Sequence, residues 1–177
     1  MDLGLTGKRA LITGGSSGLG LATARALARE GAIVSIAARN QNKLSSAVQS
    51  IEDGAHSGVH TIVCDVSEPD AVRALVERSR ELMGGVDILI ANAGGPPPGN
   101  FMTTPLDAYS EALRLNLLST VALCQLVVPA MRDRKWGRVV AITSASVREP
   151  IDRLILSNTA RAGVTGFLKT LAREVAP

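Results

Sequence analysis

A glycine-rich run near the amino terminus holds the first candidate ligand-binding residues. A short apolar segment, residues 10–12, leads into a glycine-rich run, and an Ala/Leu-rich segment with helical spacing follows. A strand, a glycine turn and a helix in this order leave backbone N–H groups free at a helix N-terminus, where a phosphate group can bind. The spacing therefore predicts a nucleotide-binding turn, with a purely structural turn as the alternative. Its residues are Gly14, Ser16, Ser17, Gly18, Leu19 and Gly20.

The glycines of this turn have separate expected roles. Gly14 allows the chain to turn tightly, and Gly18 lets a diphosphate approach the backbone. Gly20 lets the following helix pack closely against the strand. The turn is thus expected to hold the diphosphate of a dinucleotide.

The choice of dinucleotide follows from charge. About twenty residues after the glycines, NAD-binding folds place a carboxylate that bonds the ribose 2′-OH. Here that place reads Ala-Ala-Arg-Asn over residues 37–40, with no acid and with Arg39. A guanidinium binds a 2′-phosphate through charge-assisted hydrogen bonds, whereas a carboxylate repels it. The sequence predicts NADP(H) over NAD(H); the alternative is a solvated surface arginine.

The rest of the chain predicts the strands and helices that surround this turn. Strand-like and helical segments alternate without internal repeats or linkers, which favours a doubly wound parallel sheet with strand order 3-2-1-4-5. We therefore predict one α/β domain of the Rossmann type over residues 1–177. Further strands are expected at 32–37, 59–64, 86–90 and 138–142, and helices at 41–52, 69–83, 105–132 and 152–175.

Composition narrows the class of protein. The 177 residues are 46% hydrophobic but only 2% aromatic, which suits a parallel sheet covered by helices. The net charge of +3 is spread along the chain, so no nucleic-acid partner is expected. No run is expected to span a membrane, and Cys64 and Cys124 lack metal-ligand spacing, so we predict no metal and a soluble cytoplasmic domain.

Several motifs together resemble the short-chain dehydrogenase/reductase family, most closely its β-ketoacyl-acyl carrier protein reductase-like branch. The resemblance extends over the whole chain. It rests on the glycine run from Thr13 to Gly20, Cys64-Asp65-Val66, Asn92-Ala93-Gly94, Asn116, Ile142-Thr-Ser144 and the segment from Ala162 to Glu174.

The resemblance implies roles for residues along one edge of the sheet. Asp65 and Val66 would contact the adenine ring, and Asn92, Ala93 and Gly94 would lie close to the cofactor. Asn116 would hold a water in a proton relay. The alternatives are a turn or helix-capping aspartate, a simple strand-ending turn, and a structural asparagine that locks the fourth strand.

The catalytic positions depart from the family. Ser144 matches the family's serine, but Ser157 and Arg161 stand where the resemblance implies a tyrosine and a lysine. A serine hydroxyl is far less acidic than a phenol, whose pKa is about 10, and its side chain is shorter. Arg161 could bond the ribose and add positive potential, but it stays protonated and cannot act as an acid or base.

Other proton donors are weak candidates. Tyr109 lies near the start of a long helix, and Glu149 and Asp152 follow Ser144 in sequence. The family also continues beyond the position of Pro177 with another strand, a substrate-binding helix and a closing strand. The chain is therefore expected to be C-terminally truncated relative to the family, with its fifth strand at the sheet edge.

Two functions remain open on these grounds. One is an NADP-dependent oxidoreductase that transfers a hydride between the nicotinamide and a carbonyl or secondary alcohol, with an acyl thioester suggested only by resemblance. The other is an NADP-binding sensor or assembly subunit without turnover. The resemblance also implies a homo-oligomer formed through the helices at 105–132 and 152–175.

Overall fold

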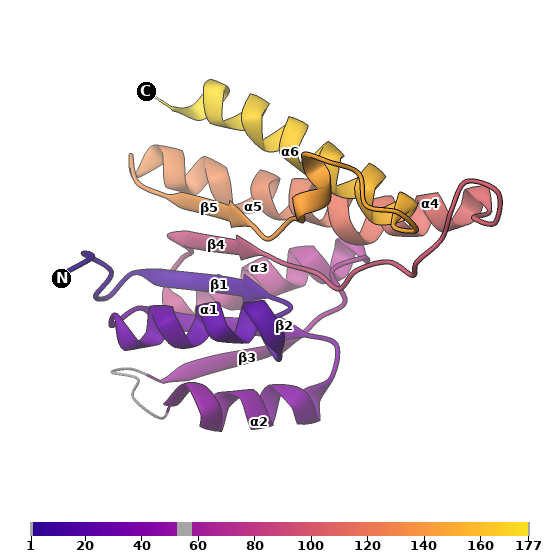
Figure 1. The fold of residues 1–177 in the computed structure, drawn as a ribbon. Coiled ribbons are helices and arrows are strands. Elements are labelled where there is room, and N and C mark those ends of the chain that lie inside the picture. The colour runs from indigo at the N-terminus through magenta and orange to yellow at the C-terminus, as the bar shows by residue number, and fades with distance from the viewer. Residues whose placement is uncertain (1, 53–57, 177) are drawn as a thin grey trace.

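The computed structural model describes residues 2–52 and 58–176. Five parallel strands form one sheet with the order β3-β2-β1-β4-β5, which confirms the predicted fold class and strand order. All five strands point the same way, so their carboxyl ends share one edge, while both chain ends lie at the opposite side (Figure 1). The strands are β1 (Arg9–Thr13), β2 (Ile33–Ala38), β3 (Val59–Val63), β4 (Ile88–Ala91) and β5 (Arg138–Ala141).

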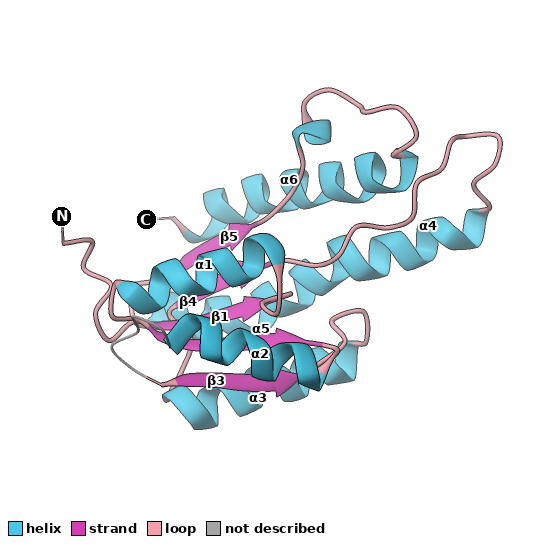
Figure 2. Ribbon diagram, turned by 60° about the horizontal axis from the view of Figure 1, so that its bottom comes forward, coloured by secondary structure: helices cyan, strands magenta, loops and turns pink. Residues whose placement is uncertain are grey.

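Helices cover both faces of the sheet (Figure 2). Two helices, α1 and α2, pack on one face, while α3, α5 and α6 pack on the other. The helices are α1 (Gly18–Arg29), α2 (Gln41–Glu52), α3 (Pro69–Met83), α4 (Leu106–Leu113), α5 (Ser119–Asp133) and α6 (Ile155–Val175).

Alternating side chains on the central strands build two separate cores. On β1, Ala10 and Ile12 face α1 and α2, whereas Leu11 faces α3 and α5. These three side chains are fully buried. Burial on both faces explains why the strands read as continuous apolar runs. It also fixes the register, because a one-residue slip would exchange the two cores.

The predicted helix at 105–132 is wrong in one respect. It is interrupted by a π-helical segment, η1 (Arg114–Leu118), which separates α4 from α5. The hydroxyl groups of Ser119 and Thr120 donate to the carbonyl oxygens of Leu115 and Asn116, at 2.6 and 3.1 Å. Side-chain donors thus satisfy carbonyls in the widened turn, a local arrangement that apolar periodicity does not reveal.

The last predicted helix also begins later than expected, at Ile155 instead of residue 152. Arg153 has a left-handed backbone with φ of 61°, which cannot continue a right-handed helix. Before it, a short 3₁₀ helix, η2 (Ala145–Val147), follows β5. The remaining strand ends differ from the prediction by one or two residues.

The expectation that no run reaches the length of a membrane span is also corrected. The continuous helical stretch Leu106–Asp133 has 28 residues and contains an 18-residue window of mean hydropathy 1.5. By length and composition alone, this stretch could cross a membrane. Within the fold, its α5 portion buries Leu123, Cys124 and Val127 against α3 and the sheet. A core helix satisfies the same criterion, so the stretch is weak evidence for a span.

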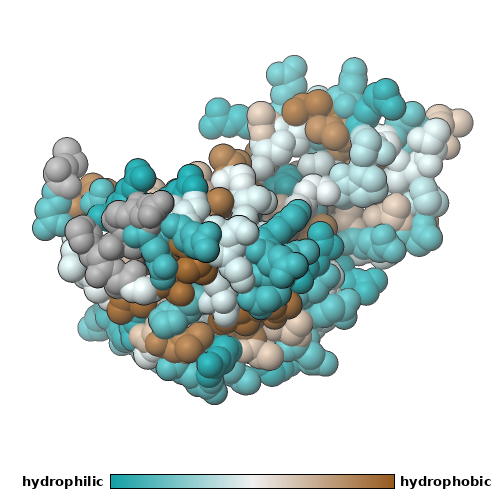
Figure 3. All heavy atoms as spheres, turned by 90° about the horizontal axis from the view of Figure 1, so that it is seen from below, coloured by the Kyte–Doolittle hydropathy of each residue, from teal (hydrophilic) through white to brown (hydrophobic). Residues whose placement is uncertain are grey.

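Both edge strands expose hydrophobic side chains. Val63 on β3 is 53% exposed and Val140 on β5 is 51% exposed. On the face seen in Figure 3, hydrophobic side chains lie in separate patches among hydrophilic ones. Because β5 pairs only with β4, it stands at a sheet edge, as the sequence predicts for the fifth strand.

An ion-pair network joins β1 to β4 at the amino end of the sheet. Arg9 Nε and Nη2 each donate to Asp87 at 2.7 Å, and Arg134 Nη2 donates to the same carboxylate at 3.2 Å. The side chain of Asp87 is only 10% exposed. Hydrogen bonding to Arg9 holds the pKa of Asp87 below its usual value, against burial, which raises it.

We predict that Asp87→Asn lowers the free energy of unfolding at pH 7 by about 1–3 kcal/mol, because two guanidinium groups lose a charged acceptor. The contribution of Asp87 to the free energy of unfolding is fully present above its unfolded-state pKa of about 3.9. This contribution is lost as the pH falls through the lower pKa of Asp87 in the folded state. Chemical denaturation from pH 7 to pH 3 should therefore show a shallower acid dependence for the variant. The control is Glu81→Gln, which breaks the exposed pair with Arg78 and should change stability by less than about 0.5 kcal/mol.

Candidate functional site

The glycine turn between β1 and α1 brings backbone segments into close contact. A Cβ on Gly14, whose φ is +59°, would lie 2.6 Å from Asn92 Nδ2. A Cβ on Gly20 would clash with the Gly14 carbonyl oxygen and lie 2.8 Å from the same amide nitrogen. Gly18 has φ of +55° and no atom within 4 Å of a Cβ position. Packing thus requires a glycine at positions 14 and 20, and also at Gly15, where a Cβ would lie 2.8 Å from the Ile36 Cβ, while Gly18 leaves an open backbone.

The end of β4 is fastened to this turn. Thr13 Oγ1 accepts from the Asn92 N–H at 2.9 Å and donates to the Asn92 carbonyl oxygen at 2.8 Å. Asn92 Nδ2 donates to the Gly14 carbonyl oxygen at 3.2 Å. The predicted strand-ending motif and the glycine turn therefore form one unit.

A cleft of about 470 Å³ opens along the carboxyl edge of the sheet. It brings together predicted cofactor residues from four strand ends, since those ends meet at one edge. The predicted residues that line it are Gly14, Ser16, Ser17, Arg39, Asp65, Val66, Asn92, Ala93 and Gly94. Gly18, Leu19 and Gly20 are not among its lining residues, and the side chain of Leu19 is 67% exposed.

The rim of the cleft beyond β2 carries two cationic side chains. Arg39 follows β2, and Lys43 lies in the first turn of α2, where Asn40 Oδ1 accepts from the Lys43 N–H at 3.0 Å. The sequence reasoning missed Lys43. Its position one helical turn after the Asn40 cap was the available signal, because that turn must face the same edge as Arg39.

Asp65 makes a turn at the end of β3. Its Oδ1 accepts from the N–H and the hydroxyl of Ser67, at 3.0 and 2.7 Å. These bonds and the nearby Arg39 guanidinium hold the pKa of Asp65 below its usual value, although burial acts in the other direction. The turn role is thus present, and Asp65 also lines the cleft beside Val66.

Asn116 lies in the π-helical segment and is only 5% exposed. Its Nδ2 donates to the Gly94 carbonyl oxygen at 3.0 Å, whereas its Oδ1 has no hydrogen-bond partner among the described residues. The contact with Gly94 locks the chain just beyond β4, as in the structural alternative for this residue. The orphaned Oδ1 remains an acceptor for a water or a ligand group.

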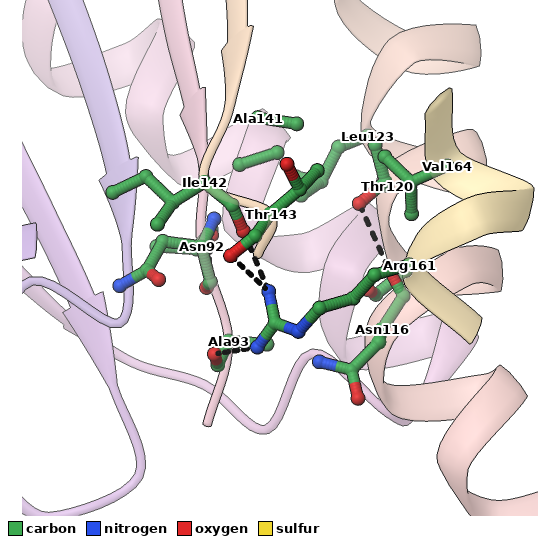
Figure 4. Close-up of a pocket in the computed structure, with 13 residues that line it drawn as sticks. Asn92, Ala93, Asn116, Thr120, Leu123, Ala141, Ile142, Thr143, Arg161 and Val164 are labelled. Atoms are coloured by element: carbon green, nitrogen blue, oxygen red, sulfur yellow. Dashed lines mark hydrogen bonds between the residues drawn. The ribbon is translucent and has the colours of Figure 1, made fainter. Parts of the chain in front are cut away.

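Arg161 reaches from α6 to the ends of two strands (Figure 4). Its Nη1 donates to the carbonyl oxygens of Ile142 and Thr143, at 2.7 and 3.3 Å. Its Nη2 makes a long bond to the Ala93 carbonyl oxygen, at 3.5 Å. Burial lowers the pKa of this guanidinium from its ordinary value, but an arginine remains protonated.

The two serines lie at the same end of the sheet as Arg161. Ser144 caps η2, where its Oγ accepts from the Ser146 N–H at 3.1 Å. Ser157 lies one turn before Arg161 on α6 and is 8% exposed. Neither serine is among the residues that line the cleft. The capping bond gives Ser144 a structural role in the part of the chain described.

The weaker candidates stand apart from the cleft as well. Tyr109 lies on α4, and Glu149 and Asp152 are exposed in the connection before α6. None of the three is among the residues that line the cleft. Within residues 2–52 and 58–176, no group of three or more His, Cys, Asp or Glu side chains could hold a metal ion.

The sequence model of the short chain dehydrogenase family matches residues 8–177, so the chain belongs to this family. Dehydrogenase/reductase SDR family member 4 of Sus scrofa is 34% identical over 174 residues, covering 98% of this chain and 62% of that protein. The ketoacyl reductase HetN of a Nostoc strain is 32% identical over 97% of this chain and 59% of its own length. The chain thus spans about three fifths of the curated relatives.

A solved structure agrees with this assignment. L-Sorbose reductase from Gluconobacter frateurii, crystallised with NADPH and L-sorbose, superposes with a TM-score of 0.94 at 36% identity. The alignment covers 99% of this chain and 66% of that one. The family model, the curated relatives and this solved structure all support the family resemblance that the motifs indicate.

We predict that Gly20→Ala lowers the free energy of unfolding by about 1–3 kcal/mol, because the added methyl group must push α1 away from the Gly14 carbonyl. Urea denaturation of purified protein measures the change. Gly166→Ala is the matched control, since Gly166 is exposed on α6 with open space around a Cβ. That variant should gain about 0.4–1 kcal/mol. Equal effects of the two changes would contradict the steric explanation.

Proposed function

We propose that this chain binds NADP(H) in the cleft and belongs to an oxidoreductase that transfers a hydride between the nicotinamide and a carbonyl or secondary alcohol. The observation that carries the proposal is the joint lining of one cleft by the glycine turn and by Arg39 and Lys43. A phosphate-binding turn and a pair of cations match the diphosphate and the 2′-phosphate of NADP(H).

The residues present fit this cofactor. A Cβ would fill the space at Gly14 and Gly20, whereas the Cβ position of Gly18 is open. An open backbone at this glycine is what the approach of a diphosphate would require. Since Arg39 follows β2 and the glycine turn follows β1, the adenosine half would lie over the ends of β2 and β3. The nicotinamide half would then lie over the ends of β4 and β5.

The chain's own residues would bind and orient the cofactor in this arrangement. Arg39 and Lys43 would hold the 2′-phosphate, and Asp65 and Val66 would flank the adenine. The backbone of Asn92, Ala93 and Gly94 would form the floor beneath the other half. When bound, the nicotinamide would supply or accept the hydride.

Proton transfer is the weak part of this site. Ser157 and Arg161 replace the tyrosine and lysine that the family resemblance implies, and the donors of Arg161 are directed to backbone carbonyls. General acid–base catalysis contributes about 10²–10⁴-fold, so carbonyl reduction by this chain should be slow. The same observation favours a second candidate function, an NADP(H)-binding sensor or assembly subunit without turnover.

The substrate of this chain and its assembly state are part of the proposal. The neighbouring reductase acts on L-sorbose and a relative is named a ketoacyl reductase, so a sugar ketone and an acyl thioester are the first substrates to assay. Pairing of two copies through the helices Leu106–Asp133 and Ile155–Val175 stays a prediction from the resemblance. Residence in the cytoplasm stays a prediction from the cysteine usage and composition of the sequence.

We predict that the double variant Arg39→Ala, Lys43→Ala weakens NADPH binding by about tenfold to hundredfold, since charge-assisted bonds of about 1.5–3 kcal/mol are lost. NADH binding should change by less than about twofold, because NADH lacks the 2′-phosphate. Fluorescence titration of the reduced nucleotides measures both affinities. Arg29→Ala, at the far end of α1, is the control and should change neither. Equal affinity of the unaltered protein for NADPH and NADH would contradict the cofactor choice.

We predict that Ser157→Tyr with Arg161→Lys raises the rate of ketone reduction at saturating NADPH by about 10²–10⁴-fold, because a phenol near a cation supplies the missing proton donor. Ser157→Phe with Arg161→Lys introduces the same ring without the hydroxyl and should give no gain. A stopped-flow assay with a ketone panel separates the two candidate functions. Measurable turnover by the unaltered protein supports the oxidoreductase, and tight NADPH binding without turnover supports the sensor or assembly subunit.

A further inference from the structure

Three consecutive carbonyl groups just beyond β4 are each held by a different element. The Asn92 carbonyl accepts from Thr13 on β1, and the Gly94 carbonyl accepts from Asn116 in the π-helical segment. Between them, the Ala93 carbonyl accepts from Arg161 on α6. The backbone of these residues lines the cleft, so its position depends on three separate side chains.

Arg161 is the member of this set that also reaches a second strand. The same guanidinium donates to Ile142 and Thr143 at the end of β5 and to Ala93 beyond β4. It is half-buried and has no ion pair with a carboxylate among those described. Backbone carbonyls are therefore its observed partners, and they join the two strand ends.

The location of the guanidinium agrees with an internal role. Arg161 lines a cavity of only about 10 Å³, together with Asn116 and Thr120, and it is not among the residues that line the large cleft. In Figure 4 the guanidinium lies between the two strand ends, with its hydrogen bonds directed to them. The guanidinium therefore contacts the backbone of Ala93, which lines the cleft, without lining the cleft itself.

We propose that Arg161 is a positioning residue that clamps the ends of β4 and β5 together and so sets the floor beneath the nicotinamide half of the cofactor. The proposal rests on the proposed function, since that function assigns the floor to NADP(H). It gives Arg161 a role different from ribose binding, the role that the family resemblance implies. The side chain acts through Ala93 and need not touch the cofactor.

The clamp requires an arginine for a geometric reason. A guanidinium is planar and holds its donors in a fixed fork, so its two terminal nitrogens can reach two strand ends at once. A lysine ammonium is a single point on a flexible stem, and cannot reproduce this spread. Lysine would suit a single contact with a ribose hydroxyl, whereas the bridge between strands requires the fork.

The test compares Arg161→Lys and Arg161→Met with the unaltered protein. Both variants should weaken NADPH binding by about tenfold, while the affinity for 2′,5′-ADP, which contains only the adenosine half, stays within about twofold. General unfolding would weaken both ligands together, so the difference isolates the nicotinamide end. Arg173→Met, on the last turn of the same helix, is the matched control and should change neither affinity.

Amide hydrogen exchange tests the clamp without any nucleotide. The Ile142 N–H donates to Ala91 across β4 and β5 at 3.0 Å, and its exchange should become at least about tenfold faster in both variants. The Cys64 N–H, which donates to Ala38 at 3.0 Å at the other side of the sheet, should keep its rate. An unchanged Ile142 rate in both variants would overturn the clamp.

The outcomes separate this inference from the proposed function. If Arg161→Lys retains full NADPH affinity, Arg161 contacts the ribose and the positioning role is wrong, while NADP(H) binding stands. If the unaltered protein binds no NADPH but Ile142 exchange accelerates in the variants, the proposed function fails and the clamp between strands remains.

Discussion

The site depends on one steric constraint, the close contact between the turn after β1 and the chain beyond β4. Gly14 and Gly20 bring two backbone segments within reach of Asn92, and Thr13 fastens the contact with reciprocal hydrogen bonds. Helix α1 can begin at its observed position only because no side chain at Gly14 or Gly20 separates the turn from Asn92. The glycines thus determine where free backbone N–H groups are presented.

Charge and burial divide the cleft into two unlike halves. The half over β2 and β3 is solvated and carries Arg39 and Lys43, which suits a phosphate that must be recognised and released. The half over β4 and β5 is held by the buried Asn116 and the half-buried Arg161, whose polar groups are directed to backbone carbonyls. The first half is built for binding and the second for fixed geometry. Ser144 and Ser157, two of the positions that the family resemblance implies for catalysis, do not line the cleft.

Much of this arrangement could be predicted from the sequence. The glycine spacing gave the turn, the alternation of apolar segments gave the strand order, and Arg39 was found because its distance from the turn is set by one βαβ unit. Lys43 was missed because it depends on where α2 begins, which Asn40 decides through a local cap. The π-helical segment was missed for a similar reason, since hydroxyl-to-carbonyl bonds compensate a widened turn that apolar periodicity still accommodates.

Some properties of Arg161 can be predicted from the sequence, whereas its hydrogen-bond partners can be found only in the folded structure. Residue types and helical spacing alone predict a permanent cation on the last helix, one turn after Ser157, and neither side chain can replace a phenol as an acid or base. Those properties belong to the side chains and to helical spacing. The direction of this cation toward the carbonyl groups of Ala93, Ile142 and Thr143 follows from tertiary packing and could not be predicted from the sequence. These carbonyl groups become neighbours because β4 pairs with β5, and Arg161 reaches them because α6 packs nearby. Residue 161 is far from residue 93 in the chain, so only this packing brings the two together.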